Sequence, residues 1–374
     1  MVCKVKMTDY VIVNKNTSNV ALKLPILTAL KLTSEYYQYH FKNRAPDGIN
    51  YIKSRGFNEE TIDKFQLGYS PSSFTQLLAQ SKNAVWRDKV KKSIGYSLND
   101  DELTETIKVL LELGGVVKSN EKGSFDRFKG RVIFPIFDLD NNIVSFGGRK
   151  INDEAYGPKY LNGSDSPVFH KNEVIFGEHL LNRLQKVDRV LVTEGYMDVA
   201  TLHQFRYETA VATMGTSINE NQIERLFQYT DCLHFCFDGD EAGIKASKRA
   251  VKQSRAALSG NRKIVITILP DGEDPDSILR SEDTVDEARD AFNIHLNNSI
   301  SIENYLLNLT LDELNLKWGQ DNQYVFASLL NDVVKMPTDS MIANKIKQFI
   351  KIESHRSAQE FENINSLELV QSFR

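Results

Sequence analysis

The sequence has few cysteines and no long apolar run, and each shortage excludes a class of protein. Its 374 residues include only Cys3, Cys232 and Cys236, too few for a disulfide framework. They also provide no complete structural zinc site, which takes four cysteine or histidine ligands. No apolar run approaches the roughly 20 residues of a membrane-spanning helix, and the N-terminus lacks the apolar core of a signal peptide. We therefore expect a cytoplasmic chain without a membrane partner and without zinc.

A strong net charge is also missing. The formal net charge of −4 means that affinity for nucleic acid has to come from local basic patches. The chain has no Gly-x4-Gly-Lys-Ser/Thr phosphate-binding loop, so nothing indicates a helicase motor. With 41% apolar residues, it is long enough to form two or three domains with their own cores.

Three patterns follow one another along the chain and predict a mixed α/β protein. After an N-terminal extension (residues 1–29), residues 30–172 combine helices, one of them with Ser34 as N-cap, with a β-hairpin, and so predict an α+β subdomain. Residues 173–295 alternate strands and helices, which predicts a mainly parallel sheet flanked by helices. Residues 296–354 have helical periodicity and predict a helical bundle, followed by a polar tail at 355–374.

Acidic residues follow each of three predicted strands in the central region: Glu194 after "RVLVT", Asp238 and Asp240 after "CLHFCF", and Asp274 and Asp276 after "KIVITILPDGE". Because the carboxyl ends of neighbouring parallel strands face one crevice, we expect these five carboxylates to converge. Gly239 is expected to allow the tight turn that points Asp238 and Asp240 toward one centre.

This arrangement of carboxylates predicts a magnesium site. Mg²⁺ prefers oxygen ligands, and two such ions about 4 Å apart stabilise the attacking and leaving oxygens of phosphoryl transfer. The alternative is that the acids cap helices or lie in solvated loops. Their recurrence at three successive strand ends favours the metal site.

The motifs around these acids resemble a known family. "TEGYMDV" (193–199), "FDGDEAG" (237–243) and "DGEDPD" (271–276) resemble the acidic motifs of the TOPRIM domain, a magnesium-binding module of bacterial primases, topoisomerases and some nucleases. "YIKSRGF", "DRFKGRVIFPIFD", "SFGGRK", "PKYLN" and "VFHK" have the order and approximate spacing of the RNA polymerase core of the bacterial replicative primase, the DnaG family. The resemblance covers residues 30–350.

The resemblance implies a role for each matching residue. Glu194 would act on the proton of the 3'-hydroxyl or position the metal that does so. Asp238 and Asp240 would be catalytic and, with Asp274 and Asp276, would hold Mg²⁺, for which Mn²⁺ can substitute. Asp198 is implied as a peripheral ligand or as a residue behind the ligands.

A second set of residues is implied to bind nucleotide and template: Arg55, Gly147, Gly148, Arg149, Lys159 and Lys171. Arginine offers a bidentate fork to phosphate and lysine a mobile point charge, while the glycines allow the backbone to approach nucleic acid closely. The alternatives are solvated surface charges and a plain bulge at the hairpin end.

The implied activity is metal-dependent nucleotidyl transfer: template-directed synthesis of short RNA primers on single-stranded DNA from ribonucleoside triphosphates, in DNA replication. The product is an RNA/DNA hybrid. The rival functions are a TOPRIM nuclease or topoisomerase-like enzyme that cleaves phosphodiesters, and an inactive primase-like module that binds DNA or a replication partner.

Primases of this family usually add a zinc-binding domain before the core and a helicase-docking domain after it, and neither fits in the lengths available here. The sequence is therefore expected to be an excised core or a naturally short primase from a phage or plasmid. A replicative helicase or a separate zinc-binding-domain protein would then be a further partner. The expected location is the bacterial cytoplasm, or the host cytoplasm for a phage-encoded chain.

Overall fold

The computed structural model describes residues 20–95, 97–152, 157–215, 217–259, 261–302 and 304–306, with residues 309 and 344. Most of the predicted N-terminal extension, most of the predicted helical bundle and the whole polar tail lie outside these ranges. The described residues fall into two compact units: the first ends at residue 183 and takes in residues 199–206, and the second comprises the rest. The predicted domain boundaries stay predictions. No helix in the described ranges is long and apolar enough to cross a membrane.

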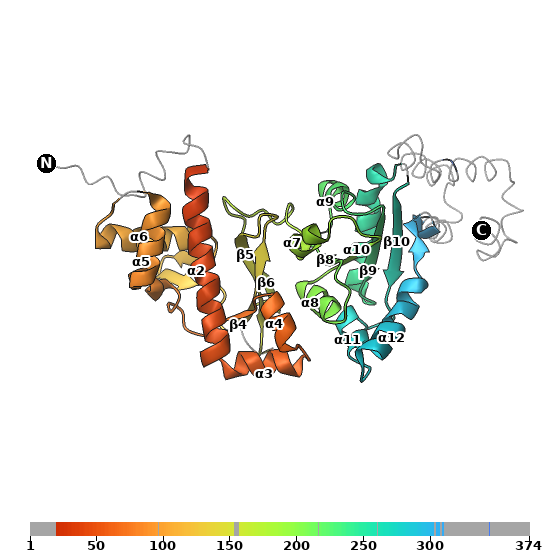
Figure 1. Ribbon diagram of the computed structural model, residues 1–374, viewed down its shortest axis with the longest axis horizontal. Helices are drawn as coiled ribbons and strands as arrows, with labels where there is room; N and C mark the ends of the chain where they lie inside the picture. The colour runs from red at the N-terminus through yellow and green to blue at the C-terminus, as the bar shows by residue number, and fades with distance from the viewer. Residues whose placement is uncertain are drawn as a thin grey trace, which may run out of the picture. The chain divides into compact units, whose positions relative to one another are not determined.

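The first unit packs helices against a four-stranded antiparallel sheet with the strand order β1-β4-β5-β6 (Figure 1). Its helices are α2 (Val20–Arg44), α3 (Pro46–Ser54), α4 (Glu59–Lys64), α5 (Ala84–Ile94), α6 (Asp100–Leu113) and α7 (Glu178–Leu181), with short 3-10 helices at Leu78–Lys82 and at Asn182–Leu184, whose last residue belongs to the second unit. Its strands are β1 (Gly68–Ser70), β4 (Arg131–Phe137), β5 (Ile143–Lys150) and β6 (Tyr160–Asn162), beside a two-stranded hairpin of β2 (Val117–Asn120) and β3 (Gly123–Asp126).

The core of the first unit lies between α2, α5, α6 and the β4–β5 hairpin. Tyr37 of α2 packs edge-on against Phe146 of β5, with ring centroids 5.6 Å apart, and both side chains are buried. The predicted N-cap at Ser34 is wrong, because α2 begins earlier, at Val20. Ser34 is buried inside the helix, where its hydroxyl accepts a hydrogen bond from the Gln38 amide at 3.0 Å. Buried apolar residues upstream of it, such as Leu30, continue the same helix into the core.

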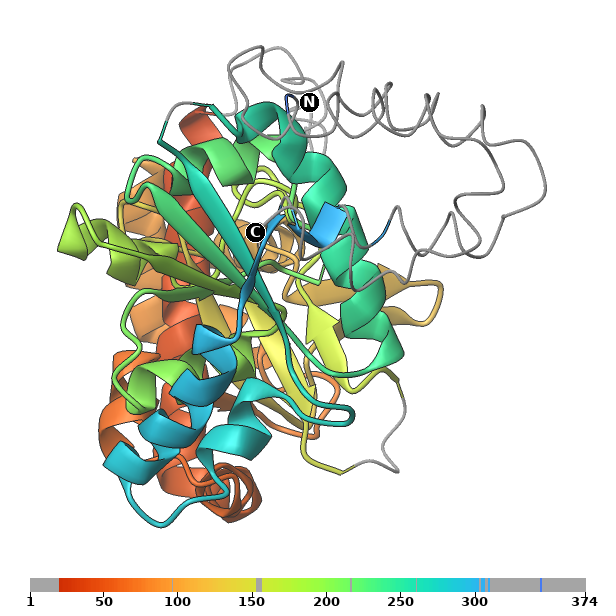
Figure 2. The same ribbon diagram turned by 90° about the vertical axis from the view of Figure 1, so that its right-hand side faces the viewer.

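The second unit confirms the predicted mainly parallel sheet flanked by helices. Its strand order is β11-β10-β9-β7-β8, with four parallel strands and β11 antiparallel at one edge (Figure 2). The strands are β7 (Val190–Thr193), β8 (Ala210–Ala212), β9 (Cys232–Phe237), β10 (Lys263–Ile268) and β11 (Ile300–Ser301). The helices are α8 (Tyr196–Gln204, whose residues from Val199 belong to the first unit), α9 (Glu220–Leu226), α10 (Glu241–Ser254), α11 (Pro275–Leu279) and α12 (Val285–Asn297), with a 3-10 helix at Arg255–Ala257.

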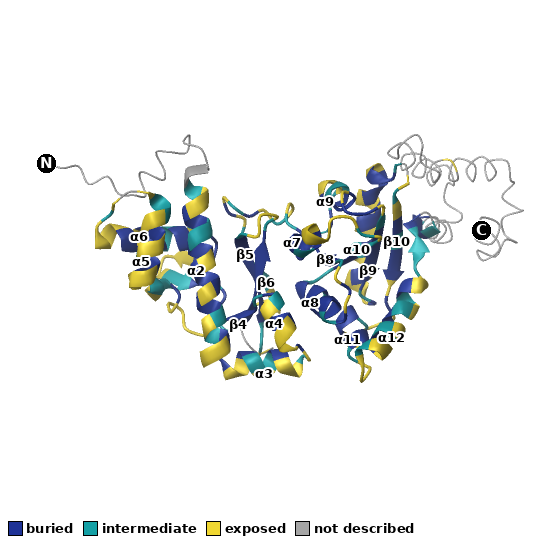
Figure 3. Cartoon of the chain, in the orientation of Figure 1, coloured by how far each residue is buried: buried dark blue, intermediate teal, exposed yellow. Residues whose placement is uncertain are grey.

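The central strands of both sheets are buried along almost their whole length, as Figure 3 shows for β4, β5 and β9. Helix α10 packs on β9 and β10, and every residue of β9 after Cys232 is buried. Strands covered on both faces read as continuous apolar segments, because neither face can be polar. This is why the sequence predicts these strands well.

Gly239 holds the loop after β9 against the loop after β10. Its N–H donates to the carbonyl of Glu273 at 2.9 Å. A Cβ atom here would overlap the carbonyl oxygen of Pro270 and lie 2.7 Å from that of Leu269. Its φ is not positive, so a left-handed backbone conformation is not what requires glycine here. The position requires glycine because two backbone segments touch.

We predict that Gly239→Ala destabilises the second unit by about 3 kcal/mol, because both neighbours are backbone and cannot rotate away. Thermal and urea unfolding followed by circular dichroism measure this. Gly195→Ala is the matched control: its Cβ would meet only the end of the flexible Asp198 side chain, at 2.8 Å. Equal losses in the two variants would contradict the prediction.

A buried histidine in the first unit links its stability to pH. His179 stacks on Phe137 of β4, with ring centroids 4.4 Å apart, and its Nδ1 is buried without a hydrogen-bond partner. Burial, followed by Arg183 and His203, lowers its pKa to about 3. The unfolded chain binds a proton here below its ordinary pKa of about 6.5, and the folded chain does not. The contribution of the buried, neutral His179 to the free energy of unfolding is therefore fully present above pH 6.5. It is lost as the pH falls toward 3.

We predict that between pH 6.5 and 5 the free energy of unfolding of the wild type falls by about 2 kcal/mol more than that of His179→Phe, which keeps the stacked ring but cannot titrate. Urea unfolding at the two pH values measures the difference. The exposed His170, changed to Gln, is the control and should follow the wild type. Parallel curves for the wild type and His179→Phe would refute the assignment.

Candidate active site

Glu194 and Asp238 lie at the ends of β7 and β9, which are neighbours in the parallel sheet. The Glu194 Oε1 atom accepts a hydrogen bond from the Asp238 backbone N–H at 3.2 Å, so the two strand ends are joined directly. Burial raises the pKa of Glu194, Asp240 raises it further, and the Asp238 N–H and Arg249 act in the opposite direction. Glu194 is thus a carboxyl group whose charged form is partly disfavoured.

Asp238 is the most perturbed of the acids that follow β9. One carboxylate oxygen, Oδ1, is buried and has no hydrogen-bond partner. Burial raises its pKa to about 7, with further contributions from Glu194, Asp274 and Asp240. A buried, unpartnered carboxylate oxygen surrounded by like charges is costly unless a proton or a cation reaches it.

Asp198 lies in the first turn of α8 and interacts with more of the other acids than its predicted peripheral role implies. Burial raises its pKa well above the ordinary value, and so do Asp238, Asp274, Asp276 and Glu194. The sequence could not reveal this, because Asp198 follows β7 by a helical turn and is separated from the other strands in the chain.

Two of the predicted ligands also cap helices, as the alternative interpretation of the sequence foresaw. Asp240 is the N-cap of α10, and its Oδ1 accepts the Gly243 N–H at 2.7 Å. Asp274 is the N-cap of α11, and its Oδ1 accepts the Ser277 N–H at 2.7 Å. Each of these bonds uses one oxygen and leaves the other outside the cap.

Asp276 is held differently from the capping acids. It is buried in the first turn of α11, and its Oδ1 accepts a hydrogen bond from Arg280 Nε at 2.6 Å, one helical turn away. This ion pair neutralises Asp276 within its own helix. A cation shared with the other acids would have to compete with the arginine.

The donor set fits a hard divalent cation. All six acids, namely Glu194, Asp198, Asp238, Asp240, Asp274 and Asp276, offer only carboxylate oxygens, and the buried Oδ1 of Asp238 has no partner. Like charges raise the pKa values of three of them. Within the described ranges, however, no three Asp, Glu, His or Cys side chains converge as a metal-ligating group. The fit therefore rests on the chemistry of the oxygens and on their mutual repulsion.

The predicted nucleotide- and template-binding residues belong to the first unit. Arg149 is buried in β5, where it is the register partner of Tyr160 in β6. Lys159 is exposed, and its Nζ lies 5.9 Å from the centre of the Tyr160 ring. Arg149 and Lys159 are therefore brought together around one tyrosine.

Arg55 and Lys171 are placed by backbone contacts. Arg55 follows the last turn of α3, where its N–H donates to the Tyr51 carbonyl at 3.0 Å. The Lys171 N–H donates to Asp165 Oδ1 at 3.0 Å, which leaves its side chain in a partly exposed position. Neither contact involves the cationic head group.

The paired glycines of β5 are both buried. A Cβ on Gly148 would lie 2.8 Å from Phe128 Cδ1 and 3.0 Å from Arg131 Cδ. The absence of a side chain at Gly148 is thus required by packing inside the unit. Gly147 faces Asn162 of β6 in the sheet register.

The sequence interpretation missed two cations, Lys118, which lies near Lys171, and Arg127, which lies near Lys118. The nearby Arg127, burial and Lys171 lower the pKa of Lys118, in that order of importance. Arg127 bonds through Nη2 to the Asn162 carbonyl at 2.9 Å, and burial lowers its pKa. Positive charges that repel one another form a local basic patch of the kind that the low net charge requires. Arg127 lies in the "DRFKGR" motif, so the sequence could have identified it as a candidate binding residue. Lys118 lies in none of the motifs, so the sequence could not.

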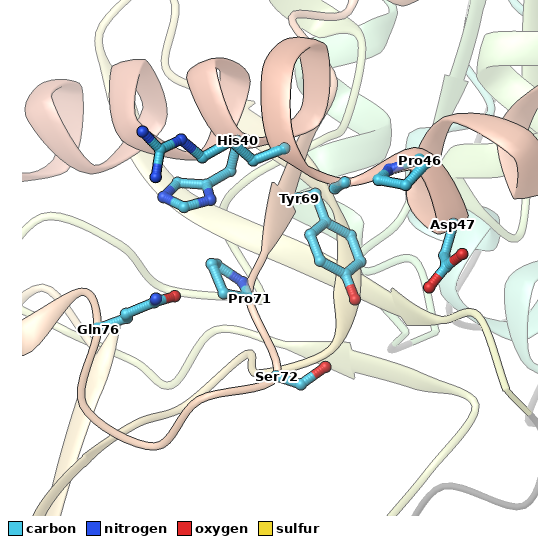
Figure 4. Close-up of a pocket in the computed structure, with 9 residues that line it drawn as sticks. His40, Pro46, Asp47, Tyr69, Pro71, Ser72 and Gln76 are labelled. Carbon is cyan, nitrogen blue, oxygen red and sulfur yellow. The ribbon is translucent and has the colours of Figure 1, made fainter.

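A separate pocket of about 350 Å³ lies in the first unit (Figure 4). It opens between the end of α2, the start of α3 and the loop after β1. His40 of α2, Tyr69 of β1, and Pro71 and Gln76 of the loop after β1 line it. None of the predicted site residues lines it.

Comparison with known proteins places the chain in a family. Residues 36–182 match the model of the DNA primase catalytic core, N-terminal domain, and residues 191–279 match a Toprim-like model. A DNA primase of Pseudomonas putida is 32% identical over 343 residues, which are 90% of this chain and 48% of that protein. One from Pseudomonas aeruginosa is 36% identical over 262 residues, 69% of this chain and 36% of the relative. The chain spans about half or less of the length of these curated relatives.

Solved structures agree with the sequence matches. The crystal structure of a DNA primase domain from Pseudomonas aeruginosa aligns with a TM-score of 0.75 and 29% identity, over 89% of this chain and 97% of that one. A DnaG primase catalytic domain bound to single-stranded DNA aligns with a TM-score of 0.73 and 27% identity, over 88% and 98%. The two family models match successive segments of the chain, and the chain shares its fold with solved primase domains. The chain therefore belongs to the bacterial DnaG-type DNA primases, as a catalytic core that carries a TOPRIM domain.

Proposed function

We propose that this chain synthesises short RNA primers on single-stranded DNA from ribonucleoside triphosphates, by metal-dependent nucleotidyl transfer. The observation that carries the proposal is the buried carboxyl of Asp238, whose Oδ1 has no partner and whose backbone N–H binds Glu194 across adjacent strand ends. Two acids joined in this way favour the binding of a divalent cation and of the phosphates that such a cation carries.

The acids have two different roles in the proposed reaction. Glu194 accepts the proton of the primer 3'-hydroxyl, a task suited to a carboxyl whose pKa is raised by burial. The 3'-oxygen then forms a bond to the α-phosphorus of the incoming nucleotide, and the bond to the pyrophosphate leaving group breaks. Asp198, Asp238, Asp240, Asp274 and Asp276 hold the cation. When bound, Mg²⁺, or Mn²⁺ in its place, neutralises charge on the attacking and leaving oxygens.

The basic residues of the first unit bind the phosphates of nucleotide and template. Arg149, Lys159, Arg55 and Lys171 supply the positive charge, and Lys118 and Arg127 extend it. The similarity to a catalytic domain bound to single-stranded DNA supports a template of that kind. An RNA/DNA hybrid as product, a helicase and a separate zinc-binding partner follow from the proposal as expectations.

The rival functions have less support. Relatives that match most of this chain are named DNA primases, and the aligned structures are primase catalytic cores. A nuclease, a topoisomerase-like enzyme or an inactive module is not favoured by these matches. An inactive module would be expected to have lost some of the acids at the strand ends, but this sequence has all six.

We predict that the wild type makes short RNA from labelled ribonucleotides on single-stranded DNA with Mg²⁺ or Mn²⁺. Asp238→Ala/Asp240→Ala should abolish the product, because it removes two proposed ligands. Glu194→Gln should reduce the rate about 10²- to 10⁴-fold, the range of a lost general base. Gel analysis of the labelled products measures both effects.

The matched control is Asp231→Asn, which removes an exposed acid just before the opposite end of β9 and should leave synthesis unchanged. If the wild type makes no product, even on primed template with a zinc-domain partner supplied, the polymerase proposal fails. Template cleavage in place of synthesis would favour the nuclease.

We predict that cation affinity depends on pH through the acids themselves. Because the pKa of Asp238 is raised to about 7, a cation has to displace a proton below that pH. The apparent affinity for Mn²⁺ should fall by up to about tenfold per unit between pH 7 and pH 6, and should level off above pH 8. Electron paramagnetic resonance of free Mn²⁺ measures this.

In Asp238→Asn the affinity should be lower at pH 8 and its pH dependence flatter, while Asp231→Asn should match the wild type. An affinity that is independent of pH in the wild type would show that Asp238 does not hold the cation.

A further inference from the structure

The turn between α3 and α4, residues 55–58, is bound by a side chain from a distant part of the chain. Gln204, the last residue of α8, donates from Nε2 to the Gly56 carbonyl at 2.9 Å, and its Oε1 accepts the Asn58 N–H at 2.9 Å. The partners are 148 and 146 residues apart in the sequence. Gln204 and the turn both belong to the first unit. We call this pair of hydrogen bonds the Gln204 clamp.

The clamp is not needed to satisfy buried polar groups. Gly56 and Asn58 are both exposed, so water would bond to the Gly56 carbonyl and to the Asn58 N–H if the glutamine were absent. Water does not fix the position of a turn, however. A planar amide that donates to one backbone group and accepts from another restrains both at once. The effect of the clamp is therefore on the position of the turn.

The end of α8 that carries Gln204 is itself firmly packed. His203 packs edge-on against Phe65, which follows the last turn of α4, with ring centroids 5.2 Å apart. Phe65 in turn stacks on Phe176, with ring centroids 5.8 Å apart, and all three side chains are buried. Gln204 thus reaches the turn from a fixed helix end.

Arg55 is the residue of the turn that has a proposed function. It ends α3 in a Schellman motif: Gly56 follows with a φ of 72°, and the N–H groups of Gly56 and Phe57 bond back to carbonyls in the last turn of α3, at 2.8 and 3.2 Å. These bonds hold the turn from the α3 side only. Gln204 holds its other side, so Arg55 projects from a backbone that is fixed on both sides.

We propose that Gln204 is a positioning residue for Arg55, whose guanidinium the clamped turn holds where it meets a phosphate of the single strand or of the incoming nucleoside triphosphate. The inference rests on the proposed function, which gives Arg55 its phosphate. A backbone that is already in place loses less conformational entropy when the ligand binds. The side chain of Gln204 does not itself touch the phosphate in this proposal.

The test is a double-mutant cycle between Gln204 and Arg55. Gln204→Met keeps the length of the side chain but has neither the amide donor nor the amide acceptor, and it is compared with Arg55→Ala and with the two changes combined. Anisotropy of labelled oligothymidylate and titration with a fluorescent nucleoside triphosphate, both without metal, give the two affinities. Gln80→Met is the matched control, because Gln80 is a glutamine of the same unit that bonds only within its own stretch of chain, to the Gln76 carbonyl at 3.3 Å.

Arg55→Ala should weaken the binding of one of the two ligands, and that ligand carries the phosphate. Gln204→Met should weaken the binding of the same ligand about three- to tenfold, the range expected for two neutral hydrogen bonds at an exposed site. The double variant should bind as weakly as Arg55→Ala alone, because the clamp acts through the arginine. Gln80→Met should bind both ligands like the wild type.

A merely structural role would have a different signature. Asp198 lies in the first turn of α8, so a variant that disturbs the whole helix should also lose affinity for Mn²⁺. Gln204→Met should keep that affinity, and circular dichroism should show it folded, because both lost bonds are exposed.

The proposal is overturned if Arg55→Ala or Gln204→Met leaves both affinities unchanged, if the losses of the two variants multiply in the double variant, or if Gln204→Met loses Mn²⁺ affinity to the same extent. A wild type that makes primers while the losses multiply would contradict this inference alone. A wild type that shows the expected cycle but makes no primers would contradict the proposed function alone.

Discussion

The hydrogen bond from the Asp238 N–H to Glu194 is the contact on which the acidic site depends. It fixes two carboxyl groups at the ends of adjacent parallel strands, where burial raises both pKa values, Asp240 adds to the rise at Glu194, and Glu194 adds to the rise at Asp238. The surrounding structure then has to hold like charges together. Gly239 does so by letting the loops after β9 and β10 touch, and Arg280 does so by neutralising Asp276 locally. The remaining repulsion is what a cation would relieve.

Among the described residues, each unit has a buried charged group without a hydrogen-bond partner, and the two charges are of opposite sign. In the second unit it is a carboxylate oxygen of Asp238, and in the first it is the guanidinium of Arg149. Each is costly for the isolated fold, because a buried charge without a partner forfeits its hydration. A cation would supply the partner that the second unit lacks, and an anion would supply the one that the first unit lacks.

The sequence predicted those parts of the fold that buried strands and glycines mark plainly, and missed those set by tertiary packing. The β4–β5 hairpin and the strands β7, β9 and β10 were identifiable because their apolar runs end in turn or acidic residues. The prediction of an N-cap at Ser34 was wrong because the sequence analysis did not recognise the helical residues before it. A serine inside a helix then looks like the start of one. The coupling of Asp198 to acids on other strands, and the approach of two backbones at Gly239, depend on chain segments distant in sequence, which no local pattern encodes.

Helix capping and cation binding were rival interpretations of the strand-end acids, but the geometry makes them compatible. Asp240 and Asp274 each commit one oxygen to a helix N-terminus. That bond restricts the rotation of the carboxylate and so directs its second oxygen. A ligand whose rotamer is already fixed loses less conformational entropy when the cation binds. The caps at these positions are therefore part of what would make the acids effective ligands, and a capping asparagine, which keeps the hydrogen bond but not the charge, would separate the two roles.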